Sequence, residues 1–563
     1  MKQGAFSFFL HSHLPYCRQA GRWPHGEEWI HEAALGCYLP LLQALWDLRE
    51  EGSAFRLAIG VTPILAEQLT DALVQEHLEE YLDDKIKRAS EDVERFEAAG
   101  SGHLAPLARF FEHRYEELLT SYRERFGRNP ISVLREFQDE GFLEVATSAA
   151  THGYLPLLQR DSSIYGQLRV GVEAYERHFG RRPRSIWLPE CGYRPAYYAQ
   201  EGGKSYVKPG LEGFLAEMGL RCFFVETHTV EGGNPVGKAQ GEVIGPYSNV
   251  PRRYVVPHPP QTLPTHHTAY LPYWAQPGQV AVLGRNDRIS MQVWSADHGY
   301  PGEPLYQDFH KRDGISGLRY WRVTGAKVDL GQKEFYDPWR AEKLVQAHAD
   351  HFVSLVEELI SGFYQQTGKY GIVLAAYDTE LFGHWWFEGV DWLAAVLRRL
   401  AESPVVELTT PSQYLEHHPP EEHMALPEGS WGQGGGHFTW LNVDTQWMWP
   451  VIHEAEVRME GLVAQHPDAG GALAETLNQA ARELLLLESS DWPFLVTTGQ
   501  AKEYAIERFK EHVQRFHRLA DAAQGGKISH GQLSYTRELY ELDKVFPKID
   551  YRTFREREGA ATR

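Results

Sequence analysis

The stretch IVLAAYDTELFGHWWFEG, residues 372–389, changes abruptly from an uncharged run to polar and aromatic residues. Its first part, Ile372–Tyr377, is uncharged and rich in aliphatic residues, which is typical of a strand buried on both faces of a parallel sheet. Asp378 follows directly, so a carboxylate stands where the strand ends. In folds built from parallel strands, residues at the carboxyl ends of the strands form the functional site. This stretch therefore predicts a buried strand and a candidate site residue.

Six further short apolar runs occur along the chain, and several of them also stop at a polar residue. They are Phe6–Leu10, Phe55–Gly60, Leu143–Ala149, Ser185–Pro189, Cys222–Val225 and Val280–Gly284. Helical patterns fill several of the gaps, as in Glu32–Glu50, Tyr165–Phe179 and Trp339–Gln366. About seven or eight buried strands alternating with helices favour a β/α barrel over an open sheet. The sequence therefore predicts an α/β protein with functional residues at the mouth of a barrel.

Two regions depart from this alternation and predict additional domains. Residues 66–140 are almost wholly helical and rich in charge, as in EEYLDDKIKRASEDVERFEAA, and predict a helical insertion after the second strand. A Pro- and Gly-rich stretch, HHPPEEHMALPEGSWGQGGGH, follows Val405–Leu408 and marks a boundary. Helical patterns continue beyond it, most clearly in Pro450–Gln465, Ala472–Glu488, Ala501–Ala523 and His530–Asp543. We predict a barrel over residues 1–65 and 141–410, an insertion over 66–140 and a carboxyl-terminal helical domain over 411–563.

Composition narrows the class of partner. The formal net charge of −20 argues against a nucleic-acid partner, because neutralising phosphates requires clusters of Lys and Arg. Aromatic residues make up 12% of the chain, including 16 Trp, which suits the binding of sugar rings but also suits a larger core. Four cysteines without CxxC spacing fit a reducing compartment. The amino-terminal apolar run is too short for a signal peptide, and no run approaches a membrane span. We expect a cytoplasmic protein with no membrane partner.

Two carboxylates follow predicted strands. Glu190 lies in IWLPECGY and Asp378 in LAAYDTELFGHWWFEG. Each taken alone could stabilise the start of a helix, since free N–H groups there attract a carboxylate. Together they place two carboxylates among aromatic residues at one barrel rim, which is the arrangement that glycoside cleavage needs.

Histidines follow two of the same strands. His11 and His13 flank one residue at a strand end, so their rings lie on one side, and His152 ends another strand. The pattern resembles that of metal-dependent amidohydrolases. Hydrogen bonding among the histidines, or to a polar substrate, is an equally good interpretation from these residues alone.

Tryptophans gather after the predicted boundary. Trp431, Trp440, Trp447 and Trp449 surround GQGGGHFTWLN, whose glycines allow the backbone to approach a ligand closely. For Trp447 and Trp449 we favour packing in a domain interface. In SSDWPFLVTTGQ, Asp491 and Gln500 flank an apolar stretch and could cap helices or bind sugar hydroxyls.

Four motifs together resemble glycoside hydrolase family 57. They are HSHLPY at 11–16, ATHGYLPLL at 150–158, WLPECGY at 187–193 and YDTELFGHWWFEG at 377–389. VWSADHGYPGEPLYQDFH at 293–310 and SSDWPFLVTTGQ at 489–500 further resemble the 1,4-α-glucan branching enzymes of that family. The resemblance runs from His11 to about Gln500 without a break in motif order.

The resemblance implies a (β/α)7 barrel with an inserted helical domain and a carboxyl-terminal helical domain, and no metal or cofactor. It implies that Glu190 is the nucleophile and Asp378 the proton donor of a retaining double displacement. It further implies substrate contacts by His11, His13, His152, Arg285, Gly302, Trp294, Trp431, Trp440, Asp491 and Gln500. The Gly- and Pro-rich segment Thr229–Arg253 would form a lid carrying Tyr247.

The implied activity is cleavage of α-1,4-glucosidic bonds and transfer of the cut chain to a 6-hydroxyl, forming an α-1,6 branch. An α-amylase or a 4-α-glucanotransferase of the same family is the near alternative. A metal-dependent hydrolase or a non-catalytic glucan-binding protein is a more distant one. We expect an α-glucan as partner and a monomer or a small homo-oligomer.

Overall fold

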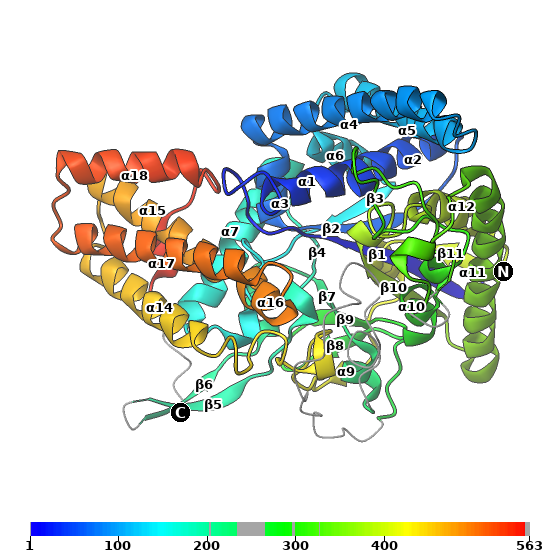
Figure 1. Ribbon diagram of the computed structural model, residues 1–563. Coiled ribbons are helices and arrows are strands. Elements are labelled where there is room, and N and C mark those ends of the chain that lie inside the picture. Colours follow the sequence, from blue (N-terminus) through cyan, green and yellow to red (C-terminus); the bar gives the residue numbers. More distant parts are fainter. Residues whose placement is uncertain (1, 202–203, 234–264, 296–298, 326, 558–563) are drawn as a thin grey trace.

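The computed structural model describes residues 2–201, 204–233, 265–295, 299–325 and 327–557. Its centre is a set of parallel strands, which occur in the chain between Gly4 and Asp378 (Figure 1). These strands are β1 (Gly4–Ser12), β2 (Leu57–Val61), β3 (Leu143–Ala146), β4 (Ser185–Ile186), β7 (Cys222–Val225), β9 (Val280–Gly284) and β10 (Gly371–Asp378). All seven predicted runs therefore form strands.

The strands follow one another in the order β10-β1-β2-β3 and β4-β7-β9. A parallel bridge between Thr147 and Ile186 joins β3 to β4. On the opposite side, the backbone N–H of Asn286, just after β9, donates to the carbonyl of Leu374 in β10 at 2.9 Å. The two sheets thus meet along both borders through one bridge and one hydrogen bond.

Side chains from all seven strands, or from the residue that follows the strand, fill the space between the two sheets. The cluster contains Ala5, Phe9, Ala58, Ala146, Trp187, Cys222, Phe224, Ala281, Leu283, Ile372, Leu374 and Ala376. Alanines on β1, β2, β3, β9 and β10 leave room for the rings of Phe9, Trp187 and Phe224, which lie against one another. A small barrel requires a single interior core to which every strand contributes side chains. The predicted α/β barrel fold is confirmed.

Helices cover the outside of the strands. The longest is α11 (Pro338–Thr367), which begins at an Asp337 cap with proline in its first turn and ends at left-handed Gly368. The others on this side are α1 (Glu27–Ala33), α2 (Leu39–Glu50) and α12 (Gly389–Glu402), with α7 (Asp161–Phe179) on the other. They bury continuous apolar clusters against the sheets.

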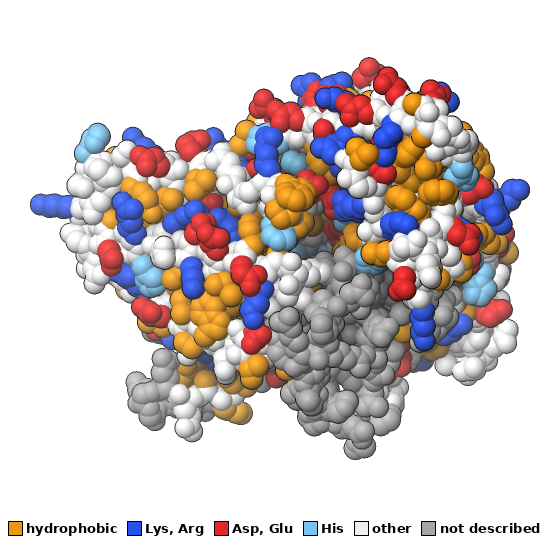
Figure 2. All heavy atoms as spheres, in the orientation of Figure 1, with side chains coloured by type: hydrophobic (Ala, Val, Ile, Leu, Met, Phe, Trp, Pro, Cys, Tyr) orange, Lys and Arg blue, Asp and Glu red, His pale blue; other side chains and the backbone are white. Residues whose placement is uncertain are grey.

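The insertion after β2 is helical, as predicted. It comprises α3 (Pro63–Leu69), α4 (Ala72–Ala98), α5 (Leu104–Thr120) and α6 (Pro130–Asp139). On α4 the buried residues Val74, Leu78, Leu82, Ala89 and Phe96 recur at helical spacing and face α5 and the barrel. Figure 2 shows acidic and basic side chains interspersed over this part of the surface, at the top of the view.

The carboxyl-terminal region is also helical. Its helices are α14 (Met448–Gln465), α15 (Gly471–Leu487), α16 (Asp491–Thr498), α17 (Lys502–Gln524) and α18 (His530–Leu542). Helix α15 is almost entirely buried over its second half, between α17 and the barrel side of the molecule. The apolar stretch between Asp491 and Gln500 forms α16, which the sequence analysis did not predict as a helix.

Smaller elements complete the fold. The hairpin of β5 (Tyr197–Glu201) and β6 (Lys204–Lys208) was not predicted, and neither were β8 (Tyr273–Ala275) and β12 (His423–Met424), which extend the second sheet. The strand β11 (Val406–Leu408) pairs with β1. Short helices α8 (Leu211–Glu217), α9 (Thr227–Glu231), α10 (Asp287–Trp294) and α13 (Pro411–His417) connect the strands. No described helix has the length and apolarity needed to span a membrane.

Candidate active site

Glu190 lies in a tight turn directly after β4. Its backbone is left-handed, with φ 60° and ψ 27°, and the next residue, Cys191, has φ 52°. Two successive non-glycine residues in this region are uncommon and cost free energy, so the surrounding structure must impose them. A Cβ on Gly192 would lie 2.9 Å from both the carbonyl of Pro189 and the ring of Tyr154, so the turn needs glycine there. The turn lifts the Glu190 carboxylate out of the packed barrel interior.

A segment from beyond the barrel holds this turn. The indole N–H of Trp431 donates to the Glu190 carboxylate, and the backbone N–H of Trp431 donates to the Glu190 carbonyl at 3.0 Å. Tyr193 and Gly429 exchange two further backbone hydrogen bonds, at 2.8 and 3.1 Å. The Trp431 ring itself is 6% exposed and packs edge-on against Trp187. Its position is therefore that of a residue that orients Glu190, with little face left for stacking on a sugar.

Asp378 ends β10 beside the first strand. It is paired in register with His11 of β1 and has ordinary extended backbone, with φ −64° and ψ 133°. Both carboxylates raise the pKa of the same buried thiol, Cys191, in addition to the larger effect of its burial. Asp378 and Glu190 therefore lie within electrostatic reach of one point at the barrel mouth.

The three predicted histidines lie together, joined by one hydrogen bond and by stacking of their rings. The Nε2 atoms of His11 and His152 are 3.1 Å apart, and the rings of His13 and His152 stack with centroids 3.8 Å apart. His13 is 3.0 Å from Thr62 Oγ1 through Nδ1 and 3.0 Å from Asp491 Oδ1 through Nε2. His152 Nδ1 is 2.9 Å from the hydroxyl of Ser490. The carboxyl-terminal region thus supplies partners for two barrel histidines.

These contacts divide the histidines electrostatically. Burial lowers the pKa of His13, but the charge and hydrogen bond of Asp491 outweigh it, so the pKa is raised. Burial and the charges of the other two histidines lower the pKa of His152 far below its usual value. The pKa of His13 is therefore shifted upward and that of His152 downward, although the two rings are stacked.

A further carboxylate in this site was missed by the sequence analysis. Glu380 accepts hydrogen bonds from the Tyr38 hydroxyl and, at 3.2 Å, from the backbone N–H of His13. Its burial, reinforced by the nearby charge of Asp378, raises its pKa to about 8. It lies two residues after Asp378 in the quoted motif, so its position was available, but only the fold shows that it is buried.

Arg285 directly follows β9, the strand that borders β10. Its guanidinium is 2.6 Å from Glu226 Oε1 and 2.9 Å from the Ser290 hydroxyl, and the side chain is buried. Both Arg285 and Glu226 act on the pKa of Cys191, which places their charges near the two candidate catalytic carboxylates.

The remaining predicted contact residues occupy different environments. Trp294, at the end of α10, is partly buried and lies 6.2 Å from Trp385 between ring centroids. Gly302 ends a short turn, and Gln500 is partly exposed after α16. Trp440 is fully buried, stacked on Tyr154 at 4.1 Å, and a Cβ on Gly432 would lie 2.5 Å from its ring. This position favours packing for Trp440. Tyr247 and the segment from residue 234 to 253 lie outside the described residues.

The fold and site define a class of protein. Two carboxylates follow separate barrel strands, and histidine, arginine and tryptophan side chains surround the space near them. Such a carboxylate pair can supply the nucleophile and the proton donor that cleavage of a glycosidic bond needs.

Comparison with known proteins places the chain in a family. Glycosyl hydrolase family 57 matches residues 7–427, and the carboxyl-terminal domain of 1,4-α-glucan branching enzymes matches residues 451–554. The chain belongs to glycosyl hydrolase family 57. It is 45% identical over 550 residues to a 1,4-α-glucan branching enzyme of Thermococcus kodakarensis, covering 97% of this chain and 78% of that protein. A probable 1,4-α-glucan branching enzyme of Mycobacterium tuberculosis is 30% identical, with 98% of each chain covered.

Solved protein structures are also similar to this chain. The branching enzyme of this family from Thermococcus kodakaraensis has a TM-score of 0.89 at 43% identity, covering 99% of this chain and 97% of that one. The corresponding enzyme from Pyrococcus horikoshii has a TM-score of 0.86 at 41% identity, with 99% and 98% covered. The α-amylase AmyC of Thermotoga maritima has a TM-score of 0.81 at 30% identity, with 99% and 100% covered.

Proposed function

We propose that this protein is a 1,4-α-glucan branching enzyme in which Glu190 is the nucleophile and Asp378 the general acid and base. The observation that carries the proposal is the pair of strand-end carboxylates, one of which receives the indole N–H of Trp431. The identity to branching enzymes over nearly the whole chain supports the reaction, and the match of residues 451–554 to their carboxyl-terminal domain supports it further.

In the first half of the reaction, protonated Asp378 gives its proton to the glycosidic oxygen of the departing glucan. A Glu190 carboxylate oxygen attacks the anomeric carbon as that bond breaks, and a covalent glucosyl ester forms with inverted configuration. The hydrogen bond from Trp431 fixes the Glu190 carboxylate at the turn after β4.

In the second half, ionised Asp378 takes the proton from the 6-hydroxyl of an acceptor chain. That oxygen attacks the anomeric carbon, the ester to Glu190 breaks, and the second inversion yields an α-1,6 branch. Asp378 ends the cycle protonated and Glu190 ends it ionised, so the enzyme is restored. Water in place of the acceptor would give hydrolysis.

Neighbouring groups assist by holding charge near the sugar. His13 is paired with Asp491, and the charges of Asp491 and Glu190 both raise its pKa. Glu380, whose pKa is about 8, is neutral at pH 7 and does not add a second full charge beside Asp378. We propose that His13, Asp491 and Glu380 position the site and set the charge around the two catalytic carboxylates.

The α-amylase reaction is the second candidate, because the similarity to a Thermotoga maritima α-amylase spans the full chain at 30% identity. One experiment separates the two. Incubation with amylose, followed by counting α-1,6 linkages and new reducing ends, should give branches in excess of reducing ends. Reducing ends without branches would establish hydrolysis instead.

The proposed reaction needs no metal. The ring nitrogens His13 Nδ1 and Nε2, His11 Nε2 and His152 Nδ1 each lie within hydrogen-bond distance of a protein group. Exhaustive treatment with a chelator should leave branching unchanged. Activity lost with the metal and restored by adding it back would instead support the metallohydrolase interpretation.

Three further proposals concern organisation. The barrel comprises residues 1–65 and 141–410, the insertion residues 66–140 and the carboxyl-terminal domain residues 411–563, so limited proteolysis should cut first within the exposed Pro-rich stretch near 418–423. The protein acts in the cytoplasm on glycogen-like glucan, which fractionation would test. It is a monomer or a small homo-oligomer without nucleic acid, which light scattering would test.

A further inference from the structure

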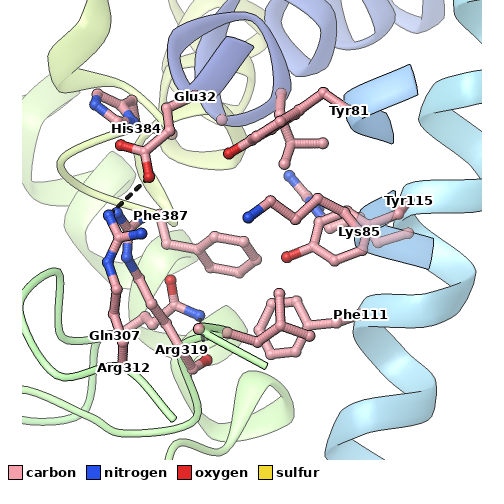
Figure 3. Close-up of a pocket in the computed structure, with 16 residues that line it drawn as sticks. Glu32, Tyr81, Lys85, Phe111, Tyr115, Gln307, Arg312, Arg319, His384 and Phe387 are labelled. Atoms are coloured by element: carbon pink, nitrogen blue, oxygen red, sulfur yellow. Dashed lines mark hydrogen bonds and ion pairs between the residues drawn. The ribbon is translucent and has the colours of Figure 1, made fainter. Parts of the chain in front are cut away.

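A pocket separate from the carboxylates lies between the helical insertion and the barrel. One wall consists of Tyr81 and Lys85 on α4 with Phe111, Arg114 and Tyr115 on α5. The opposite wall carries Glu32, Arg312, Arg319, His384 and Phe387. Figure 3 shows Lys85 and Tyr115 pointing from the two helices toward the arginines across the gap. The pocket is thus lined by four parts of the chain, namely residues 32–36, the insertion helices α4 and α5, residues 307–319 and residues 383–387.

The lining has an excess of positive charge in a chain whose net charge is −20. Lys85, Arg114, Arg312 and Arg319 line the pocket, and Glu32 is the only carboxylate among its lining residues. Arg312 forms an ion pair with Glu32 at 2.7 Å. Figure 3 marks this contact.

The other three cations have no carboxylate within ion-pair distance among the described residues. Lys85 lies over the ring of Tyr81, Arg114 over Phe387 and Arg319 over Phe309, at 4.6, 4.8 and 4.3 Å from the ring centroids. The Nε of Arg319 is also buried without a hydrogen-bond partner in the described part of the chain. Arginines elsewhere on the insertion, such as Arg123 and Arg128, are paired with Glu79. Cations that converge without partners are a recurrent feature of anion sites.

The charges that line the pocket shift the pKa values of Glu32 and Arg319. Although burial would raise the pKa of Glu32, the charges of Arg319, His384 and Arg312 lower it to about 2. Burial lowers the pKa of Arg319; the charge of Glu32 opposes this effect, and the charge of Arg312 adds to it. Holding these cations together therefore costs free energy, which a bound anion would offset.

The space suits a small ligand. The room inside the pocket is about 70 Å³, roughly five times the minimum that one ordered water occupies. That is enough for a tetrahedral oxyanion. The hydroxyls of Tyr81 and Tyr115 and the amide of Gln307 add polar groups to the lining, while Phe111 and Phe387 supply apolar surface.

We propose that this pocket binds a phosphate-sized oxyanion, held by Lys85 and Arg114 on one wall and by Arg319 and Arg312 on the other. The source is either inorganic phosphate or the phosphoryl group of a small phosphate ester. The site does not depend on the proposed branching reaction, since none of these side chains belongs to the group around Glu190 and Asp378.

Calorimetric titration of the whole protein with inorganic phosphate, at ionic strength held constant with sodium chloride, tests the proposal. The wild-type protein should show saturable binding at one site. Lys85→Gln and Arg114→Gln should each weaken it about tenfold or more, because each removes a charge-assisted contact. Glu32→Gln should strengthen it, because the variant removes the competing carboxylate. Repeating the titration with a hexose monophosphate and the free hexose separates the sources, since only an ester site would bind the former more tightly than phosphate.

Matched controls are available on the same helices. Lys87→Gln on α4 and Arg109→Gln on α5 make the same changes in charge at exposed residues, which pair with Glu91 and Glu97 respectively. They should leave the affinity unchanged. Circular dichroism establishes that each variant is folded. The absence of saturable binding would overturn the proposal, as would equal losses in the pocket and control variants, or an affinity that Lys85→Gln and Arg114→Gln both leave unaltered.

Discussion

Glu190 and Asp378 both follow a barrel strand, but the protein holds them by different means. Glu190 has left-handed backbone and is bound through its carbonyl and its carboxylate by Trp431, from the segment after the barrel. Asp378 has extended backbone continuous with β10 and lies beside His11 of the adjacent strand. Its neighbour Glu380 contacts Tyr38 and His13, which also belong to the barrel side.

The difference indicates which parts of the chain each role depends on. A nucleophile must stay fixed while a covalent bond forms at one of its oxygens, and the clamp from Trp431 provides that restraint. A group that gives and then takes a proton must change charge within each cycle, so its surroundings must tolerate both states. Strand β10 sets the backbone of Asp378, whereas the position of Glu190 also requires the segment that leads into the carboxyl-terminal helices.

The largest expected effects follow from removing either carboxylate. Glu190→Gln and Asp378→Asn should each lower the rate of amylose cleavage by several orders of magnitude, because the two groups act as one unit. Both proteins should fold, since residues at the active face of a barrel contribute little to the core. Branching assays and thermal melts on the same preparations measure both effects.

Azide distinguishes the two roles, because it is a nucleophile that needs no proton removed. With Glu190→Ala and an activated α-glucosyl donor, azide should attack the anomeric carbon directly and give the β-glucosyl azide. With Asp378→Ala, azide should intercept the covalent ester and give the α-glucosyl azide. The reverse pattern would exchange the two assignments, and near-wild-type activity in either variant would exclude that residue.

Loss of the hydrogen bond from Trp431 to Glu190 should have the next largest effect. Trp431→Phe keeps a ring in place but removes the hydrogen bond to Glu190, a contact to a charged group worth roughly 1.5–3 kcal/mol. The turnover number should fall about 10- to 100-fold, with little change in the affinity for glucan. Measurement of kcat and KM on amylose gives the result.

Trp440→Phe is the matched control for this prediction. Trp440 lies nine residues from Trp431 in the same segment but is fully buried against Tyr154. Its replacement should lower the melting temperature and leave turnover per folded molecule unchanged. If the two variants behaved alike, Trp431 would be a packing residue as well.

The contrast between these tryptophans marks the limit of what the sequence could predict. Strands and their polar ends were predictable, because period and charge are local properties, and all seven runs formed strands. Both tryptophans adjoin the same glycine-rich stretch, so no sequence pattern distinguishes the one that binds Glu190 from the one in the core. Helix α16 was missed because an apolar stretch of eight residues has no polar face from which to recognise a helical period. The burial of Glu380 depends on Tyr38, which is distant in sequence.

A smaller effect should come from the contact between the carboxyl-terminal helices and His13. Asp491 raises the pKa of His13, so the pair stabilises the fold fully below the unfolded pKa of about 6.5. That contribution is lost as the pH rises through the folded pKa. Asp491→Asn should therefore destabilise the protein by about 1–3 kcal/mol at pH 6 and by less at pH 9. Chemical denaturation at the two pH values measures this.

The branching activity of Asp491→Asn provides a second test of the contact between Asp491 and His13. If Asp491 also holds the His13 ring in place beside the site, Asp491→Asn should lower branching several-fold near neutral pH, at substrate concentrations that saturate the wild-type enzyme. Ser529→Ala, which removes a helix cap at α18 far from the histidines, is a control of similar structural cost. Destabilisation of Asp491→Asn that is equal at pH 6 and pH 9 would contradict the proposed ion pair.

The smallest effect at neutral pH is expected for Glu380→Gln, two residues after Asp378. Because the pKa of Glu380 is about 8, the side chain is protonated at pH 7, and a glutamine reproduces its shape and still accepts from Tyr38 and from the His13 backbone. Branching at pH 7 should therefore change little. Above pH 8 wild-type Glu380 becomes charged beside Asp378, which the variant avoids, so the wild-type enzyme should lose activity there in a step that Glu380→Gln lacks.

The raised pKa of Glu380 also predicts how the free energy of unfolding depends on pH. Between the ordinary pKa of 4.5 and the folded value of about 8, the unfolded state has released the Glu380 proton and the folded state retains it. The unfolded state then binds fewer protons, so wild-type stability falls as the pH rises across this window. Glutamine has no proton to release, so the free energy of unfolding of Glu380→Gln relative to wild type should increase from pH 4.5 to pH 8 and then level off. A difference that stays constant over this range would show that Glu380 is ionised in the folded protein, and Asp378 would then share its wall of the site with a second full charge.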